Sequence, residues 1–291
     1  MSSRGNQFTS FAEDNFSQSG ASGLYDRARP TYPGPAFDRI LSVLGGHATV
    51  VELGAGSGIF TRGFLQAAAS ATQDADDLID ELIAVEPSRG MRDGFEKKLD
   101  ELDRNRSASR RVRVSIQDGL FDRIPVDDAK ADLVVIAQAF HWVGRDGESA
   151  IREIARVLKP HGTLALIWNY EDRSVPWVAQ LRDAYEVHEA GTPQARLGWW
   201  KSIFDTEFYS ATYAPAELET FHRDLATTED GVVDRILSKS YITALAQDEQ
   251  DRVARDMRAI VARGDGKRWI DQTAGTFQYP YNTELYLIRK K

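Results

Sequence analysis

The stretch Val50–Gly58, which reads VVELGAGSG, constrains the fold more than any other part of this chain. An apolar strand runs directly into a turn with glycines at alternate positions, Gly54, Gly56 and Gly58. Because glycine lacks a Cβ atom and tolerates positive φ, such a turn lets a ligand lie against the main chain at the start of the next helix. The pattern predicts a strand–turn–helix unit of an α/β protein, with a nucleotide-like ligand at the turn.

The spacing of these glycines argues against a dinucleotide. The dinucleotide fingerprint needs a third glycine three residues after the second, and Ile59 occupies that position. Glu52 would also place a carboxylate beside the pyrophosphate, at a helix N-terminus that favours anions. A cationic ligand with an amino group fits this loop better, so a dehydrogenase is disfavoured.

Further apolar strands follow, and several end in polar or aromatic side chains. The predicted strands are 82–85, 112–116, 131–137, 163–168, 218–225 and 283–288, with helices at 150–158, 231–240 and 248–262. The strand 82–85 ends at Glu86, the next at Asp118, and the continuous apolar run 131–137 ends in Gln138. Open α/β sheets bind ligands at the carboxyl ends of their strands, so we expect these residues to share one site.

Three segments together resemble one family. The loop 52–58 reads acidic-x-Gly-x-Gly-x-Gly, residues 137–142 read AQAFHW, and 158–166 read LKPHGTLAL. They are similar to the Rossmann-like, class I S-adenosylmethionine-dependent methyltransferases of small molecules, including trans-aconitate methyltransferases and fungal dithiol S-methyltransferases of the gliotoxin bis-thiomethyltransferase sort. The resemblance implies an α/β fold: a seven-stranded, mostly parallel, doubly wound sheet with a helical cap over the strand C-terminal ends.

The resemblance also implies how S-adenosylmethionine is held and released as S-adenosylhomocysteine. Glu86 would accept the ribose hydroxyls and Asp118 the adenine amino group, while Arg29 would pair with the donor's carboxylate or an acidic substrate. A lid over residues 23–34 would close on the donor, with Tyr25 over the sulfonium. The expected cofactor-binding residues are Tyr25, Arg29, Glu52, Gly54, Ala55, Gly56, Gly58, Glu86, Pro87, Met91, Asp118, Gly119, Gln138 and Phe140.

Aromatic residues are the expected walls for the methyl group and the acceptor. Phe140, His141 and Trp142 follow the fourth strand, where the methyl donor should end, and aromatic faces stabilise a sulfonium cation. His141 is expected to be a wall rather than an acid or base. The expected substrate-binding residues are Trp168, Tyr170, Trp199 and Trp200, in or near a cap insertion at about 170–210.

Length and composition limit the remaining possibilities. The 291 residues suffice for a mobile tail, 1–22, and a single methyltransferase domain, 23–291. A net charge of −8 disfavours nucleic acid as a partner, and no apolar run is long enough to span a membrane. The chain has no cysteine and its five histidines are scattered, so we expect no metal. We expect a cytoplasmic monomer or weak homodimer that acts on a small molecule.

The acceptor atom is the open part of this interpretation. An aromatic pocket favours S-methylation of thiols or dithiols of secondary metabolism, since a thiol near its pKa needs little base catalysis. Carboxyl O-methylation of the trans-aconitate type also needs no base, but calls for several cationic residues in the pocket. A non-catalytic scaffold that only binds S-adenosylmethionine is the alternative from another class, because a fold alone does not establish chemistry.

Overall fold

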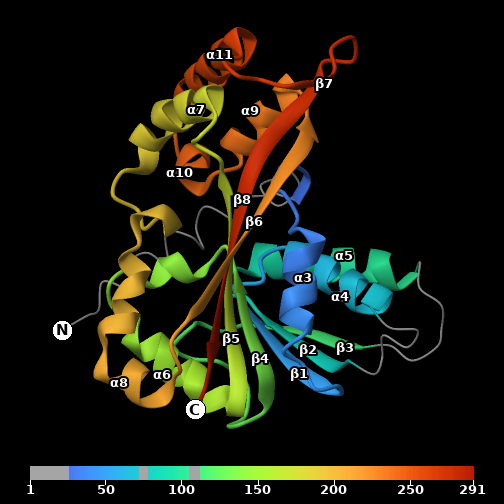
Figure 1. Cartoon of the computed structure of the whole chain (residues 1–291), viewed down its shortest axis with the longest axis vertical. Helices are drawn as coiled ribbons and strands as arrows, with labels where there is room; N and C mark the ends of the chain where they lie inside the picture. The colour runs from blue at the N-terminus through green and yellow to red at the C-terminus, as the bar shows by residue number, and fades with distance from the viewer. Residues whose placement is uncertain (1–25, 72–77, 105–111) are drawn as a thin grey trace.

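The computed structural model describes residues 26–71, 78–104 and 112–291. Its strands form one mixed sheet in the order β3-β2-β1-β4-β5-β8-β6, with β7 paired to β8 (Figure 1). Strands β1 to β5 pair in parallel, whereas β8 runs antiparallel to both β5 and β6. The strands are β1 (Ala48–Leu53), β2 (Ile79–Val85), β3 (Arg113–Gln117), β4 (Ala131–Ala137), β5 (Leu158–Glu171), β6 (Glu217–Thr227), β7 (Trp269–Asp271) and β8 (Thr276–Arg289). The predicted mostly parallel α/β sheet is therefore confirmed.

Helices connect these strands and cover the sheet on both faces. The α-helices are α3 (Gly34–Leu41), α4 (Ile59–Ala71), α5 (Arg89–Arg104), α6 (Glu148–Val157), α7 (Pro176–Glu186), α8 (Glu207–Thr212), α9 (Glu229–Leu237), α10 (Ser240–Thr243) and α11 (Gln247–Arg263). Single turns of 3₁₀ helix occur at η2 (Phe140–Val143), η3 (Val187–Glu189) and η4 (Ala195–Leu197), and a longer one at η5 (Trp199–Asp205). Among the described residues, no helix is long and apolar enough to cross a membrane.

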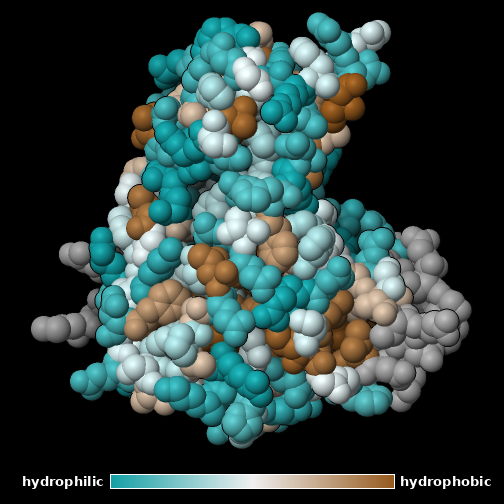
Figure 2. Space-filling model, in the orientation of Figure 1, coloured by the Kyte–Doolittle hydropathy of each residue, from teal (hydrophilic) through white to brown (hydrophobic). Residues whose placement is uncertain are grey.

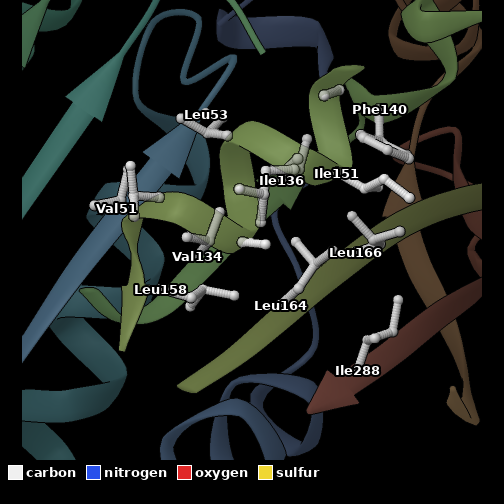
Figure 3. Close-up of a cluster of buried hydrophobic side chains, with 14 of the residues drawn as sticks. Val51, Leu53, Val134, Ile136, Phe140, Ile151, Leu158, Leu164, Leu166 and Ile288 are labelled. Atoms are coloured by element: carbon white, nitrogen blue, oxygen red, sulfur yellow. The ribbon is translucent and has the colours of Figure 1, made fainter. Parts of the chain in front are cut away.

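The two faces of the sheet alternate along each strand, as the pleat requires. Val50 of β1 and Leu133 of β4 face a cluster that includes α3, α4 and Phe95 of α5. Val51 and Val134, one residue further along, face the opposite cluster with α6, η5 and α8, part of which Figure 3 shows. Because both faces are buried, β1 and β4 read as continuous apolar runs, which is why the sequence predicted them as central parallel strands.

The last strands extend beyond the parallel ones and carry a second body of helices. β5 and β8 pair from Thr163–Arg289 to Glu171–Tyr281, and β6 continues beside β8 to Thr227. On these extensions α7, α9, α10 and α11 enclose a separate apolar cluster with Phe277 of β8. These helices form the upper part of Figure 1, and their outer face is mainly hydrophilic in Figure 2. We call this body the cap.

The cap contains helices outside the predicted insertion at 170–210, and part of that predicted insertion does not belong to the cap. Helices α9 to α11 belong to it, whereas Trp200 and Ile203 of η5 and Tyr209 of α8 pack on the sheet's second face. β8 begins at Thr276, seven residues before the predicted start. The prediction began too late because Pro280 lies inside the strand, and a proline, which lacks an N–H group for the ladder, is evidence against a strand in the sequence.

Candidate functional site

The glycine loop leaves its backbone open on one side. Gly54, Gly56 and Gly58 all have positive φ, at 68°, 57° and 81°. A Cβ on Gly54 would lie 2.7 Å from Cβ of Ala139, so this residue brings the loop against the segment after β4. A Cβ on Gly56 would meet no atom of the described residues within 4 Å. Within this part of the chain, the space beside Gly56 is therefore open to a ligand that touches the main chain.

Glu86 lies at the tip of β2 and is bound to this loop. The backbone N–H of Gly56 donates to Glu86 Oε2 at 2.9 Å, and the N–H of Ser88 donates to Oε1 at the same distance. The carboxylate is buried and lines the cavity beside the loop. Two backbone donors fix its position, so it is ready to accept hydroxyl groups of a ligand.

Glu52 is buried beneath the loop, where Thr61 Oγ1 donates to its Oε2. Burial raises the pKa of Glu52 to about 8, and the hydrogen bond from Thr61 and the charge of Arg62 oppose the shift. Glu52 lines a hollow of ≈ 40 Å³ together with Arg29 and Tyr32. A cation in this hollow would favour the ionised carboxylate.

A larger cavity of ≈ 270 Å³ extends from the glycine loop to the cap. On the loop side it is bounded by Gly56, Glu86 and Gly119, with Asp122 as a further carboxylate, and Asp146 lines it after η2. On the cap side the lining is strongly charged. Its charged members there are Arg182, Arg196, Arg235, Lys239, Glu171, Glu186 and Glu189.

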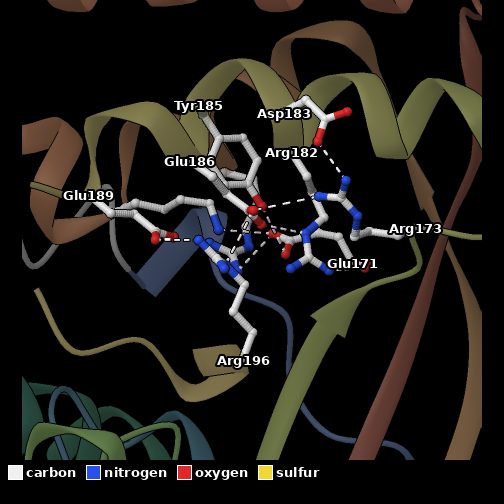
Figure 4. Close-up of polar contacts among 10 residues, drawn as sticks. Glu171, Arg173, Arg182, Asp183, Tyr185, Glu186, Glu189 and Arg196 are labelled. Atoms are coloured by element: carbon white, nitrogen blue, oxygen red, sulfur yellow. Dashed lines mark hydrogen bonds and ion pairs between the residues drawn. The ribbon is translucent and has the colours of Figure 1, made fainter. Parts of the chain in front are cut away.

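The cap residues form one polar network, which Figure 4 shows in part. Arg182 Nε donates to Glu186 Oε1 at 2.7 Å, and Arg196 pairs with Glu186 and Glu189. Glu171, the last residue of β5, lies beneath them, where Tyr185 Oη donates to its Oε2 at 3.3 Å. The network lies at the carboxyl end of the sheet, where ligand sites of open α/β sheets occur.

Arg29 joins the two sides of the cavity. It lines both the small hollow and the large cavity, and its Nε and Nη2 donate to the hydroxyl and carbonyl of Ser238 at the end of α9, at 3.1 and 2.9 Å. Asp26, three residues earlier, accepts from Ser57 of the glycine loop and from Arg62. This segment of the predicted lid therefore bridges the loop and the cap.

His141 has the properties of a neutral wall residue. Burial, followed by the positive charge of Arg29, lowers the pKa of His141 to about 3. Trp168 Nε1 donates toward His141 Nδ1 at 3.4 Å, which requires an unprotonated Nδ1. A base with this pKa is poorly matched to proton transfer near neutral pH.

The structure brings most of the predicted site residues together. Those that line the large cavity are Arg29, Gly54, Gly56, Glu86, Pro87, Met91, Gly119, Gln138, His141, Trp142 and Tyr170. Glu52 and Ala55 line the small hollow instead. Gly58 lines neither cavity. It packs against α5 instead, where a Cβ on Gly58 would lie 2.7 Å from the ring of Phe95. Tyr25 lies outside the described residues.

Several predicted wall residues lie elsewhere. Phe140, Trp168 and Trp200 have 0 % of their surface exposed and belong to the core cluster on the sheet's second face. Trp168 stacks on Trp200 with ring centroids 4.4 Å apart, while Trp199 lies under the guanidinium of Arg145. Asp118 is 73 % exposed and pairs with Arg92 at the rim, so the backbone at Gly119, rather than this side chain, lines the cavity.

The position of Trp200 predicts a stability effect. We expect Trp200→Ala to lower the free energy of unfolding by about 3–5 kcal/mol, because it removes a fully buried ring and leaves a void. Trp199→Ala is the matched control: Trp199 is half-buried, and its cation–π contact with the exposed Arg145 is worth about 0.5–1 kcal/mol. Denaturant unfolding of both variants checks this, and similar losses would contradict the core assignment of Trp200.

The charged cap residues were not predicted from the sequence. Arg182 and Arg235 lie on amphipathic helices, where a charged residue is normally taken as solvent-facing. Glu171 did have a signal, because it is a charged residue at the end of a buried strand. The predicted strand ended at Trp168, three residues too early, so this signal was missed.

Sequence comparisons identify the family of the chain. Residues 51–166, which span the glycine loop to β5, match the methyltransferase domain family. An uncharacterized methyltransferase-like protein of Schizosaccharomyces pombe is 30 % identical over 239 residues, which is 81 % of this chain and 82 % of that protein. A second uncharacterized methyltransferase of that yeast is 38 % identical over 170 residues, but these cover only 57 % of this chain and 58 % of the relative. An uncharacterized Mycobacterium tuberculosis methyltransferase is 35 % identical over 55 % of each chain.

Solved structures agree on the fold. Haemonchus contortus phosphoethanolamine N-methyltransferase 2, solved with phosphomonomethylethanolamine and S-adenosylhomocysteine, superposes with a TM-score of 0.54 at 14 % identity over 97 % of this chain and 60 % of that one. The MccD protein superposes with a TM-score of 0.51 at 15 % identity, over 90 % of this chain and all of that one. At such identities the likeness concerns the fold alone. The long match to the S. pombe relative, together with the matched domain, shows that the chain belongs to the methyltransferase family.

Proposed function

We propose that the protein is an S-adenosylmethionine-dependent methyltransferase that methylates a carboxylate oxygen of a small acidic molecule. The observation that carries the acceptor class is the charge of the cavity. Four cationic side chains, Arg182, Arg196, Arg235 and Lys239, line the cap side together with three carboxylates, Glu171, Glu186 and Glu189. The loop side instead carries Glu86 and Asp122 and no cationic side chain other than the bridging Arg29 among the described lining residues. A cationic donor suits the loop side, and an anionic acceptor suits the cap side.

The residues of the loop side fit the donor. Gly56 leaves open the space that a ligand backbone contact needs, and Glu86 is fixed as an acceptor for ribose hydroxyls. Glu52 and Arg29 line the hollow suited to the amino and carboxyl groups of the methionine part. We keep Asp118 as a partner of the adenine amino group at the rim. When bound, S-adenosylmethionine supplies an electrophilic methyl group, whose transfer to a carboxylate forms a methyl ester and leaves neutral S-adenosylhomocysteine.

Within this proposal the protein acts by positioning and by excluding water. Tyr170 and the cap cations hold the acceptor next to the donor cleft, which turns an encounter of two molecules into a step within one complex. A carboxylate is already ionised at neutral pH and needs no base. This agrees with a neutral, weakly basic His141 in the same cavity.

Dithiol S-methylation is the second candidate. The sequence favoured this reaction because an aromatic acceptor pocket was expected. Of the residues expected for that pocket, only Tyr170, His141 and Trp142 line the cavity. A thiolate is also an anion and would suit the same cations, so it stays a testable alternative. Secondary metabolites as acceptors, a cytoplasmic location and a monomeric or weakly dimeric state stay predictions from the sequence.

The acceptor class is tested by transfer of labelled methyl from S-adenosylmethionine to matched small acids, dithiols and phenols, followed by mass spectrometry. We expect label in a base-labile methyl ester of an acid. Label in a thioether would show that the acceptor is a thiol and not a carboxylate. Donor binding without any labelled product would favour the non-catalytic scaffold.

The raised pKa of Glu52 predicts proton release on donor binding. At pH 7 a carboxyl with a pKa of about 8 is mostly protonated, and a bound cation lowers that pKa. Binding of S-adenosylmethionine at pH 7 should then release up to about one proton, and affinity should rise as pH increases toward 8. Calorimetry in phosphate and Tris buffers measures this release. Glu52→Gln, which keeps the hydrogen bond from Thr61, should abolish it, whereas identical heats in both buffers for the parent protein would contradict it.

A further inference from the structure

Arg235 and Lys239 bring two positive charges to the deepest part of the cap side. Arg235 lies on α9 and Lys239 just beyond its end, and both line the cavity although only 4 % and 8 % of their surfaces are exposed. Removing a cation from water is costly unless an anion and hydrogen bonds replace the water. The partners of these two residues therefore decide what the site can accept.

One carboxylate serves both cations. Glu171 Oε1 lies 3.1 Å from Arg235 Nη2 and 3.1 Å from Lys239 Nζ. These cations hold the pKa of Glu171 well below its usual range, against the effect of burial. Since Glu171 is ionised and supplies one negative charge, the trio keeps a net charge of one positive unit when Lys239 is protonated.

Hydrogen-bonding capacity also remains on both cations. Nε and Nη1 of Arg235 are buried and meet no hydrogen-bond partner of good geometry among the described residues, with the Tyr281 phenol as the polar group that interacts with this guanidinium. The ammonium of Lys239 has three donors; it donates to Glu171 and lies 4.4 Å from the ring centre of Tyr185. Arg235 and protonated Lys239 carry two positive charges, and the Glu171 carboxylate that they share neutralises one of them, so a second anion would balance the other.

We propose that Arg235 and Lys239 form a subsite for a second, non-reacting carboxylate of the acceptor, so that the protein selects di-acids over mono-acids. This inference rests on the proposed function in one respect, namely that the acceptor occupies the cap side of the cavity. The reacting carboxylate lies toward the donor, and the second one completes the charge of the Glu171 trio.

Occupation of this subsite is linked to a proton. The charged and titratable groups that act on Lys239 are Glu171 of β5, Arg235 of α9, Tyr185 of α7, Glu189 of η3 and Arg29 before α3, and Tyr241 of α10 lines the same cavity. Burial, and then the charge of Arg235, lowers the pKa of Lys239 to about 7. An anion favours the ammonium and raises this pKa, so binding takes up a proton. Affinity for a di-acid should then be full below pH 7 and fall as pH rises above it.

The test uses straight-chain acids in matched pairs of equal carbon number, from succinate and butanoate to adipate and hexanoate. Their binding is measured by calorimetry with the protein saturated by S-adenosylhomocysteine, at pH 6 and pH 8.5. At pH 6 we expect at least one di-acid to bind about tenfold or more tightly than its mono-acid, the size of one charge-assisted hydrogen bond. This preference should shrink at pH 8.5.

Two substitutions separate the subsite from general effects. Lys239→Gln should abolish most of the preference for the di-acid, whereas Lys239→Arg should keep it and remove its pH dependence, because an arginine stays protonated. Lys130→Gln is the matched control: Lys130 pairs with Glu81 just before β4, at the opposite end of the strands. Unchanged affinity for S-adenosylhomocysteine shows that each variant is folded.

The outcomes are distinct from those of the methyl-transfer test. Equal binding of every pair by the parent protein, or a preference that survives Lys239→Gln, overturns the subsite even if acids are methylated. A preference for di-acids that depends on Lys239 supports the subsite even if no acid receives a methyl group, and in that case it is the proposed reaction that fails.

Discussion

Replacing Gly56 with valine should abolish binding of S-adenosylmethionine. Gly56 lines both the small hollow and the large cavity, and a Cβ there meets nothing within 4 Å in the described parts of the chain. The valine side chain would fill the space that a ligand needs beside the main chain. Its φ of 57° adds a strain of about 1–3 kcal/mol for a non-glycine residue. We expect donor affinity to fall by a factor of more than about 100, or over 2.7 kcal/mol, measured by calorimetry.

Gly275→Val is a close control for this substitution. Gly275 has a φ of 67°, and a Cβ there also meets none of the described residues within 4 Å, but it lies in the turn between β7 and β8. The two variants therefore share the backbone strain and differ in their distance from the cavity. If both bound S-adenosylmethionine as the parent protein does, the donor would not lie against the glycine loop.

Glu86→Ala should weaken donor binding by a factor on the order of 10–100, because it removes the acceptor for the ribose hydroxyls. The same change leaves the N–H groups of Gly56 and Ser88 without their carboxylate partner, which loosens the loop that the donor touches. Calorimetric titration with S-adenosylhomocysteine measures the effect without turnover.

Asp118→Ala provides the comparison, since Asp118 lies at the end of the neighbouring strand but is 73 % exposed. Exposed hydrogen bonds and ion pairs contribute little, so we expect a loss of affinity below about threefold, within the ~1 kcal/mol typical of exposed pairs. A larger loss for Asp118→Ala than for Glu86→Ala would reverse the assigned importance of these two strand tips.

The parallel part of the fold was predictable because its signals are local. β1 and β4 are buried on both faces, so each is a continuous apolar run that ends in the residues of the site. The glycine loop and Glu86 follow from the same logic, since strand, turn and helix are adjacent in sequence. The α/β class and the strand ends at residues 53, 85 and 137 can be inferred from local sequence patterns, without knowing which distant residues are in contact.

The cap and the acceptor side were not predictable in this way. Trp168 and Trp200 looked like pocket walls because they lie near a predicted strand tip, yet β5 continues to Glu171 and the two rings pack below the site. Arg235 and Lys239 are buried only because β5, α7 and α9, far apart in the sequence, enclose them. The sequence alone therefore suggested an aromatic acceptor pocket, whereas the cavity combines aromatic side chains such as Trp142 and Tyr170 with charged cap residues that no local pattern indicated.

The central claim is that one cavity holds the donor on its loop side and directs the methyl group toward the cationic cap side. A crystal structure with S-adenosylhomocysteine tests it most directly. The account predicts the ribose at Glu86, the backbone of the ligand against Gly56, and the sulfur atom facing the chamber of Tyr170, Arg235 and Lys239. A sulfur atom that points away from this chamber, or a ligand bound outside the cavity, would contradict it.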